Sequence, residues 1–356
     1  MALSLYLIGA PRSGKTAVFE ALTNTPEGRH FSAKGAHHVG TVKVPDARLA
    51  ALRDLYQPKK YTPAEVTFVD VALPPVPEGR HALSSLTALL GEADAFVLVV
   101  QAFGEMDSRG KPLDPAGQMD SMVLELVFAD LEKVETRLGR IEHERKRGLK
   151  INTAEATALE KSKAALEAGQ PLRLVEWSGE EEKVLRTFQF LSMKPALVVA
   201  NVGEGDLKGA MLDPLRQAAE RHGYQTLIFC AVLEAEMAQL DPSAQAAFLK
   251  DYGLDEPARV RLIQGAYRLL NLISFFTVGE DEVRAWTIRR GTSALAAAGK
   301  VHSDIERGFI RAETVASADL LQTRLWSACR DNATLRLEGK TYEVRDGDVI
   351  HFRFNA

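Results

Sequence analysis

The sequence contains few cysteines and no long apolar run. Its 356 residues include only Cys230 and Cys329, too few for a disulfide framework, so we expect a reducing compartment and no disulfides. No apolar stretch approaches the roughly 20 residues that a membrane-spanning helix needs. The apolar N-terminus lacks the basic region and cleavage site of a signal peptide, and it predicts a strand instead. These absences predict a cytoplasmic protein without a membrane segment.

The sequence also lacks the residue patterns of several enzyme classes. No cysteine–histidine pattern has metal-site spacing, no G-x-S-x-G motif occurs, and nothing suggests a catalytic triad. The formal net charge of −4 argues against a protein that binds polyanions over its whole surface. A local basic patch that contacts nucleic acid remains compatible with this charge.

Short β-rich runs separated by helical stretches dominate the chain up to about residue 232. These runs are apolar almost throughout, which is typical of strands buried on both faces of a parallel sheet. They cover residues 3–8, 65–73, 95–100, 195–201 and 225–232.

Two further regions have a different texture. Between about 118 and 190, apolar residues at helical spacing among many charges predict an antiparallel helical hairpin, and RKRGLK (145–150) supplies a basic turn. After about residue 275 the pattern becomes β-rich again, and alternation on both sides of RDGD (345–348) predicts a β-hairpin.

Residues 9–16, GAPRSGKT, match the phosphate-binding pattern G-x-x-x-x-G-K-[ST] between a predicted strand and a predicted helix. Its glycines let backbone N–H groups curl around a phosphate, and the helix start adds the positive end of its dipole. Lys15 is expected to reach the β- and γ-phosphates, and the Thr16 hydroxyl to bind Mg²⁺. The predicted nucleotide contacts in this P-loop are Pro11, Arg12, Ser13, Gly14, Lys15 and Thr16.

Two further positions complete the predicted site. A P-loop needs a carboxylate on an adjacent strand for Mg²⁺, and Asp70 at the end of EVTFVD fits; the alternative is a turn or cap residue. Asn201 follows a late buried strand, where GTP-specific proteins carry an Asn-Lys-x-Asp motif. Here Val202 and Glu204 replace the lysine and the aspartate that binds guanine, so strict guanine recognition is weakened and adenine is favoured.

At these residues the sequence resembles the YchF-type Obg-like ATPases, a family of the translation-factor class of P-loop proteins. The resemblance runs over almost the whole chain and is most specific toward the C-terminus. It rests on the P-loop and on VPDARL (44–49), FVDVA (68–72), FLSMKPALVVANVGE (190–204), AYRLLNLISFFTVGEDEVRAWTI (266–288), AAGKVHSDIERGFIRAETV (297–315) and YEVRDGDVIHFRFN (342–355).

The resemblance implies an α/β fold with three parts. These are a P-loop G-domain (1–117 and 191–274) with a mostly parallel sheet, an inserted helical coiled-coil hairpin (118–190), and a C-terminal TGS domain of β-grasp type (275–356). It further implies ATP binding, with GTP as an alternative, Mg²⁺ as cofactor, and ribosome contacts through the hairpin and the TGS domain. The base contacts would be Asn201, Val202, Glu204, Cys230, Ala231 and Val232, with a buried structural thiol as the alternative for Cys230.

The sequence departs from the family in both switch regions. Leu73 replaces the glycine whose N–H bonds the γ-phosphate, and PPVP (74–77) follows it. The segment 31–40, FSAKGAHHVG, has no threonine for Mg²⁺, although Lys34 or the pair His37 and His38 are candidate substitutes. A site that binds ATP and ADP equally shifts no conformational equilibrium. Two hypotheses therefore stand: a slow ATPase switch, and a hydrolysis-deficient paralogue that binds nucleotide structurally and works as an interaction module.

Overall fold

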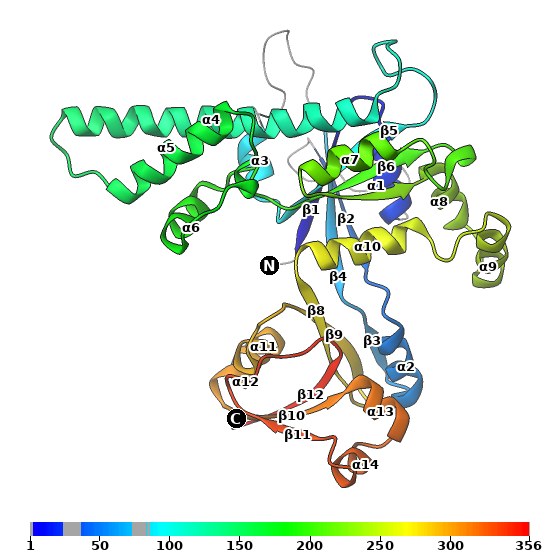
Figure 1. Cartoon of the computed structure of the whole chain (residues 1–356). Helices are drawn as coiled ribbons and strands as arrows, with labels where there is room; N and C mark the ends of the chain where they lie inside the picture. The colour runs from blue at the N-terminus through cyan, green and yellow to red at the C-terminus, as the bar shows by residue number, and fades with distance from the viewer. Residues whose placement is uncertain (1–2, 24–36, 73–82, 84–85, 356) are drawn as a thin grey trace. The chain divides into compact units, whose positions relative to one another are not determined.

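The computed structural model describes residues 3–23, 37–72, 83 and 86–355. The chain divides into two compact units, and each contains a six-stranded sheet (Figure 1). The first unit comprises Met1–Thr41 and Thr67–Leu262, and the second comprises Val42–Val66 and Ile263–Ala356. No helix in the described ranges has the length and apolar composition that would let it cross a bilayer.

The sheet of the first unit has the strand order β2-β4-β1-β5-β6-β7. The five strands from β4 to β7 in this order run parallel, and β5 and β6 are buried along almost their whole length, as in strands covered on both faces. The carboxyl ends of these strands therefore share one edge, where open α/β sheets bind ligands. The strands are β1 (Ser4–Gly9), β2 (His37–Lys43), β4 (Glu65–Val71), β5 (Ala95–Ala102), β6 (Ala196–Val202) and β7 (Gln225–Phe229).

Helices connect these strands, as crossovers between parallel strands require. The predicted α/β class with a mostly parallel sheet and a helical insertion is confirmed. The helices are α1 (Lys15–Thr23), α3 (Thr87–Gly91), α4 (Pro115–Lys146), α5 (Thr153–Glu167), α6 (Gly179–Leu185), α7 (Asp213–Arg221), α8 (Ala231–Met237), α9 (Pro242–Asp251) and α10 (Ala258–Leu269).

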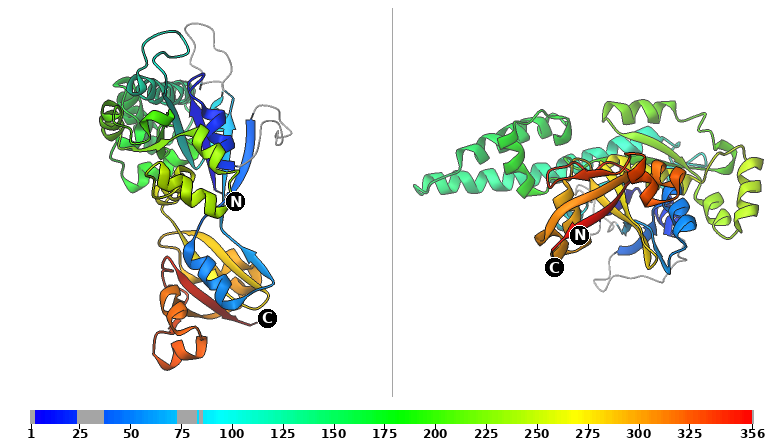
Figure 2. Two further views of the ribbon diagram at one scale, coloured as in Figure 1. Left: turned by 90° about the vertical axis from the view of Figure 1, so that its right-hand side faces the viewer. Right: turned by 90° about the horizontal axis from the view of Figure 1, so that it is seen from below.

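The helices α4 and α5 form the hairpin, which extends from the sheet of the first unit (Figure 1 and Figure 2). Asp114 caps the start of α4, where its side chain accepts the N–H of Gly117. The two helices share an apolar core that includes Val134 and Leu159, and Arg137 of α4 forms an ion pair with Glu155 of α5 (2.5 Å). The first turns of α4 pack instead against β5 and α7. One helix thus joins the hairpin core to the sheet.

Asp130 of α4 anchors the segment that leads into β6. Its carboxylate is 1% exposed and accepts the N–H groups of Leu191 (2.8 Å) and Ser192 (2.7 Å) and the Ser192 hydroxyl (2.6 Å). Burial raises the pKa of Asp130 to about 6, against the opposing effect of these hydrogen bonds.

The raised pKa of Asp130 is expected to make the free energy of unfolding depend on pH. The folded protein holds this proton more tightly than the unfolded chain, so the free energy of unfolding falls as pH rises from about 3.8 to about 6. The size of this effect is on the order of 3 kcal/mol. Urea unfolding at a series of pH values should show a shallower fall over this window in Asp130→Asn than in the unsubstituted protein. Equal pH slopes in the two proteins would contradict this assignment.

The second unit has a mixed sheet with the strand order β11-β10-β12-β8-β9-β3. β12 is parallel to β8 and antiparallel to β10, and the alanine-rich α11 packs into the core beside Phe275 and Phe309. Its elements are α2 (Ala47–Tyr56), β3 (Lys60–Thr62), β8 (Leu272–Thr277), β9 (Glu282–Arg289), α11 (Ala294–Val301), α12 (Ser303–Arg307), β10 (Phe309–Ala316), α13 (Ser317–Thr323), α14 (Trp326–Asp331), β11 (Arg336–Glu338) and β12 (Asp348–Phe354).

The second unit differs from the sequence prediction in two respects. Residues 42–66 were assigned to the G-domain, yet β3 pairs with β9 and α2 packs against β9 and α13. The predicted hairpin around 345–348 is wrong, because β12 pairs with β10 and Glu343 forms only an isolated bridge with Ser293. The buried carboxylate of Asp348 holds this turn instead, through the N–H of Arg345 and the Tyr342 hydroxyl.

Candidate nucleotide-binding site

The P-loop connects the carboxyl end of β1 to the start of α1. The backbone angle φ is positive at Arg12 (65°) and at Gly14 (78°), and the N–H of Ser13 donates to the carbonyl of Ala10 (3.1 Å). Such a succession of left- and right-handed residues aims backbone N–H groups into one concavity, which attracts anions. A positive φ is strained for a residue other than glycine, and such strain is typical of functional sites. At Arg12 it occurs within the predicted phosphate-binding loop.

The side chains of the loop point in different directions. Those of Pro11 and Arg12 are exposed, whereas Ser13 is 1% exposed. Its hydroxyl lies under Gly9, where an added Cβ would come within 2.6 Å of it, and it has no hydrogen-bond partner among the described residues. Ser13 can therefore face a phosphate only through its backbone.

Gly14 is required by both its backbone angle and its surroundings. A Cβ at this position would lie 2.1 Å from Nδ2 of Asn201, in addition to the strain of φ 78°. The absence of a side chain at Gly14 therefore lets the Asn201 amide pack directly against the loop backbone.

Lys15, Thr16 and Asp70 meet at the start of α1. The Lys15 ammonium pairs with Oδ1 of Asp70, and the Thr16 hydroxyl donates to Oδ2 of the same carboxylate (3.0 Å). Asp70 is 4% exposed and lies next to Leu7 of β1, which places it at the shared carboxyl edge of the sheet. The sequence prediction that Asp70 faces the P-loop therefore has a direct geometric basis.

His38 of β2 also reaches this carboxylate. Its Nδ1 lies 3.5 Å from Oδ2 of Asp70, and its ring is near that of Phe19. The pair of histidines was one predicted substitute for the missing threonine, and the structure brings His38 to the carboxylate. Lys34, the other candidate, and the substituted residues Leu73 and 74–77 lie outside the described residues.

The donor set fits Mg²⁺. No group of three or more histidine, cysteine, aspartate or glutamate side chains gathers within the described ranges to hold a metal by itself. Mg²⁺ commonly binds through one or two protein oxygens and completes its shell with phosphate oxygens and water. Thr16 and Asp70 supply oxygens of that kind beside the P-loop, so they would hold Mg²⁺ together with a bound nucleotide.

Asn201 joins the P-loop to the start of α8. Its Nδ2 donates to the carbonyl of Ser13 (3.1 Å), and its Oδ1 accepts the N–H of Ala231 (3.2 Å). Asn201 itself is 4% exposed at the end of β6. The side chain therefore fixes the distance between the phosphate cradle and the segment where base contacts were predicted.

The structure ends β7 earlier than the sequence predicted. The strand stops at Phe229, and Ala231 and Val232 begin α8 instead of continuing the run to residue 232. Cys230 at the junction is buried, and burial raises the pKa of its thiol against the opposing N–H groups of Leu233 and Val232. The apolar composition of this run suits either a strand or a buried helix start, and periodicity cannot separate them.

The predicted base contacts are not equivalent. Glu204 is exposed and lies close enough to the Cys230 thiol to affect its pKa, and Val232 is 57% exposed. Val202 is buried in the core of the first unit, so its side chain packs into that core. Ala231 is also buried and presents its N–H to Asn201. Glu204 and Val232 are the predicted base contacts whose side chains are exposed.

Sequence reasoning missed Phe103 and the loop that it begins. The Phe103 side chain lies 3.7 Å from the Cβ positions that Gly14 and Gly203 would have. The connection 103–114 then runs past the beginning of the P-loop, where Arg109 lines a cavity together with Gly9 and Pro11. Gly104, Gly110 and Pro112 indicate turns in this connection. Nothing in the linear sequence indicates that the connection lies near the P-loop.

Comparison with known proteins covers the full chain. Residues 272–355 match the family model YchF-GTPase_C, described as a protein of unknown function (DUF933). The chain is 37% identical over 373 residues to "Ribosome-binding ATPase YchF" of Bacillus subtilis (strain 168), with 100% of both chains covered. It is 36% identical over 359 residues to the protein of the same name from Escherichia coli O157:H7, with 98% of both covered.

A solved structure is similar over almost the same length. The match to the Schizosaccharomyces pombe YchF GTPase has a TM-score of 0.84 and 29% sequence identity. It covers 99% of this chain and 97% of that one.

Proposed function

The chain belongs to the YchF family, and from this premise we propose that it binds ATP with Mg²⁺, hydrolyses it slowly and acts on or near the ribosome. The observation that carries this proposal is the meeting of Lys15, Thr16 and Asp70 beside a P-loop with positive φ at Arg12 and Gly14. Lys15 would neutralise the β- and γ-phosphates, while Thr16 and Asp70 would hold the metal. The bound Mg²⁺ would supply charge neutralisation at the phosphate oxygens.

We propose adenine in preference to guanine. The position of the aspartate that binds two guanine nitrogens is taken by the exposed Glu204, and the preceding lysine is replaced by the buried Val202. The remaining proposed base contacts are Asn201, Cys230, Ala231 and Val232. Relatives of the chain are named both as an ATPase and as a GTPase, so GTP is the competing ligand in the test.

The proposed ribosome contacts lie on the hairpin and on a C-terminal TGS domain. Residues 145–150 at the hairpin turn include four exposed basic side chains, which suit contact with RNA phosphates. The proposed division is a G-domain (1–41, 67–117 and 191–274), a hairpin (118–190) and a TGS domain (275–356) to which residues 42–66 also belong. The proposed location is the cytoplasm, where ribosomes work.

Nucleotide affinity and turnover test this proposal. Dissociation constants for ATP, ADP and GTP with Mg²⁺ should show ATP bound at least as tightly as GTP. Single-turnover hydrolysis should be slow without ribosomes and measurable with them. A strong preference for GTP would contradict the adenine assignment, and absence of binding to all three would contradict the proposal as a whole.

The competing hypothesis is a paralogue that binds nucleotide without hydrolysing it. Two substitutions favour this hypothesis: Leu73 replaces the switch glycine, and the segment 31–40 lacks the switch threonine. In the family, that glycine and that threonine contact the γ-phosphate or its Mg²⁺, and these contacts order the switch loops. Equal affinities for ATP and ADP, together with no turnover on ribosomes, would support this interaction module and exclude the switch.

A further inference from the structure

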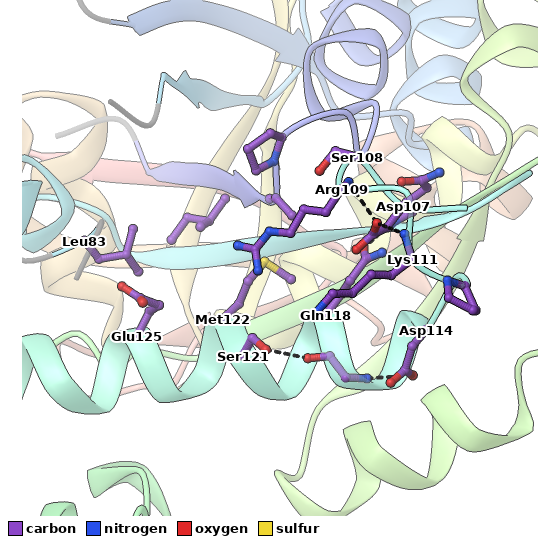
Figure 3. Close-up of a pocket in the computed structure, with 17 residues that line it drawn as sticks. Leu83, Asp107, Ser108, Arg109, Lys111, Asp114, Gln118, Ser121, Met122 and Glu125 are labelled. Carbon is purple, nitrogen blue, oxygen red and sulfur yellow. Dashed lines mark hydrogen bonds between the residues drawn. The ribbon is translucent and has the colours of Figure 1, made fainter. Parts of the chain in front are cut away.

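A cavity of about 600 Å³ adjoins the first half of the P-loop (Figure 3). Gly9 and Pro11 form part of its wall, α4 contributes Met122, and the connection 103–114 contributes Arg109 and Lys111. Two elements remote in sequence from the P-loop motif therefore border the start of the phosphate cradle.

The connection 103–114 is stabilised by hydrogen bonds from Asp107 within it and from Gln101 of β5. Oδ1 of Asp107 accepts the N–H groups of Arg109 (2.8 Å) and Lys111 (2.9 Å). Nε2 of Gln101 donates to the carbonyls of Phe103 (3.1 Å) and Met106 (3.0 Å). A side chain carried by such a loop is presented in a defined place without a large ordering cost on ligand binding.

The Arg109 guanidinium is one of two cationic groups that this loop brings to the cavity, the other being the Lys111 ammonium. Figure 3 shows Arg109 extended across the cavity in the direction of Leu83, and the guanidinium has no hydrogen bond or ion pair within the described ranges. Two carboxylates around the cavity are bonded to backbone groups: Asp107 accepts N–H groups of its own loop, and Asp114 accepts the N–H of Gly117. Arg109 thus has hydrogen-bond donors available for a ligand.

The two halves of the P-loop face different ends of a bound nucleotide. Ser13 and Gly14 in the second half contact Asn201, which leads to the predicted base segment. Gly9 and Pro11 belong to the half away from Asn201, and this half borders the cavity. In a nucleotide bound with its base toward Asn201, the phosphate furthest from the base would therefore lie toward the cavity that Arg109 lines.

We propose that Arg109 contacts the terminal phosphate of a bound nucleoside triphosphate and so distinguishes ATP from ADP. The inference rests on the proposed nucleotide binding and deepens it, because it names a residue that reads the terminal phosphate. Such a residue is needed here, since the chain has neither the switch glycine after Asp70 nor a threonine in 31–40. The planar guanidinium matches two phosphate oxygens at once, which a lysine ammonium does not.

The experiment compares triphosphate and diphosphate affinity. The probes are ADP and an ATP analogue with an imido group between the β- and γ-phosphorus, both with Mg²⁺, so that turnover does not interfere. Arg109→Ala should lower the affinity for the analogue by about 10-fold or more, as expected for the loss of hydrogen bonds to a charged group. It should leave the affinity for ADP within about 2-fold of that of the unsubstituted protein. Arg109→Lys should recover only part of the lost affinity for the analogue, because lysine keeps the positive charge but cannot donate two parallel hydrogen bonds to phosphate.

Arg186→Ala is the matched control, since it removes the same charge from an exposed arginine of the first unit that does not line the cavity. We expect it to leave the ratio of the two affinities unchanged. Equal weakening of both nucleotides in Arg109→Ala, no weakening of either, or the same effect in Arg186→Ala would overturn the assignment. So would an unsubstituted protein that binds the analogue and ADP equally.

Failure of this inference is distinguishable from failure of the proposed function. If the unsubstituted protein binds neither nucleotide, the proposed function fails and this inference with it. If the unsubstituted protein binds both and Arg109→Ala changes neither, only the role of Arg109 fails.

Discussion

Replacement of Lys15 by alanine is expected to lower the affinity for MgATP by about 100-fold or more without unfolding the protein. The ammonium lies at the junction of the P-loop and α1, and it also balances the charge of Asp70, which is 4% exposed. The variant loses charge-assisted hydrogen bonds to phosphate, and the remaining carboxylate repels the anionic ligand. A 100-fold loss corresponds to about 2.7 kcal/mol. Isothermal titration with MgATP measures it directly.

Lys250→Ala provides the control for this measurement. Lys250 is an exposed lysine of α9, so the variant loses the same charge at the surface of the same unit. Its affinity for MgATP should equal that of the unsubstituted protein, and both variants should keep the unfolding midpoint of the unsubstituted protein within a few degrees. Retention of MgATP binding in Lys15→Ala would show that the nucleotide site lies elsewhere.

Replacement of Asn201 by alanine is expected to reduce both stability and nucleotide binding. The substitution leaves the carbonyl of Ser13 and the N–H of Ala231 without their partner, and both residues are buried. Each unsatisfied buried group costs roughly 1–3 kcal/mol, so the free energy of unfolding of the first unit should fall by about 2–6 kcal/mol. The affinity for MgATP should fall as well, because the P-loop is no longer tied to the start of α8.

Urea unfolding followed by circular dichroism measures this loss. The matched control is Asn332→Ala, which removes an exposed asparagine amide from the second unit. We expect that variant to unfold within about 0.5 kcal/mol of the unsubstituted protein, as is usual for surface substitutions. An equally small effect of Asn201→Ala would show that water satisfies both backbone groups and that Asn201 does not brace the site.

The candidate site was predictable to the extent that its chemistry is local. The P-loop spacing identifies Gly14, Lys15 and Thr16, because a phosphate cradle needs those residue types in that order. Asp70 could be selected because the carboxyl ends of parallel strands share an edge. The bracing role of Asn201 could not be predicted, since its partners Ser13 and Ala231 are distant in sequence and are backbone groups.

The difference between local sequence pattern and contacts between distant segments also explains the wrong predictions at strand boundaries. The run 225–232 is apolar from Leu227 onward, but β7 ends at Phe229 and α8 begins two residues later. Alternation around 345–348 resembled a hairpin, yet the chain before Asp348 turns away and β12 finds its partners in β8 and β10. Local pattern specifies which face of a segment is apolar, and it leaves open which other segment covers that face.

The sequence by itself determined the α/β class, the phosphate-binding chemistry and the family, because these depend on short motifs and on the periodicity of apolar residues. Only the tertiary structure decided that residues 42–66 join the second sheet through β3 and β9. It also decided that His38 reaches Asp70 and that Arg109 borders the P-loop. These juxtapositions join segments far apart in the chain. Their formation depends on the combined packing of the whole unit, which no local stretch of sequence encodes.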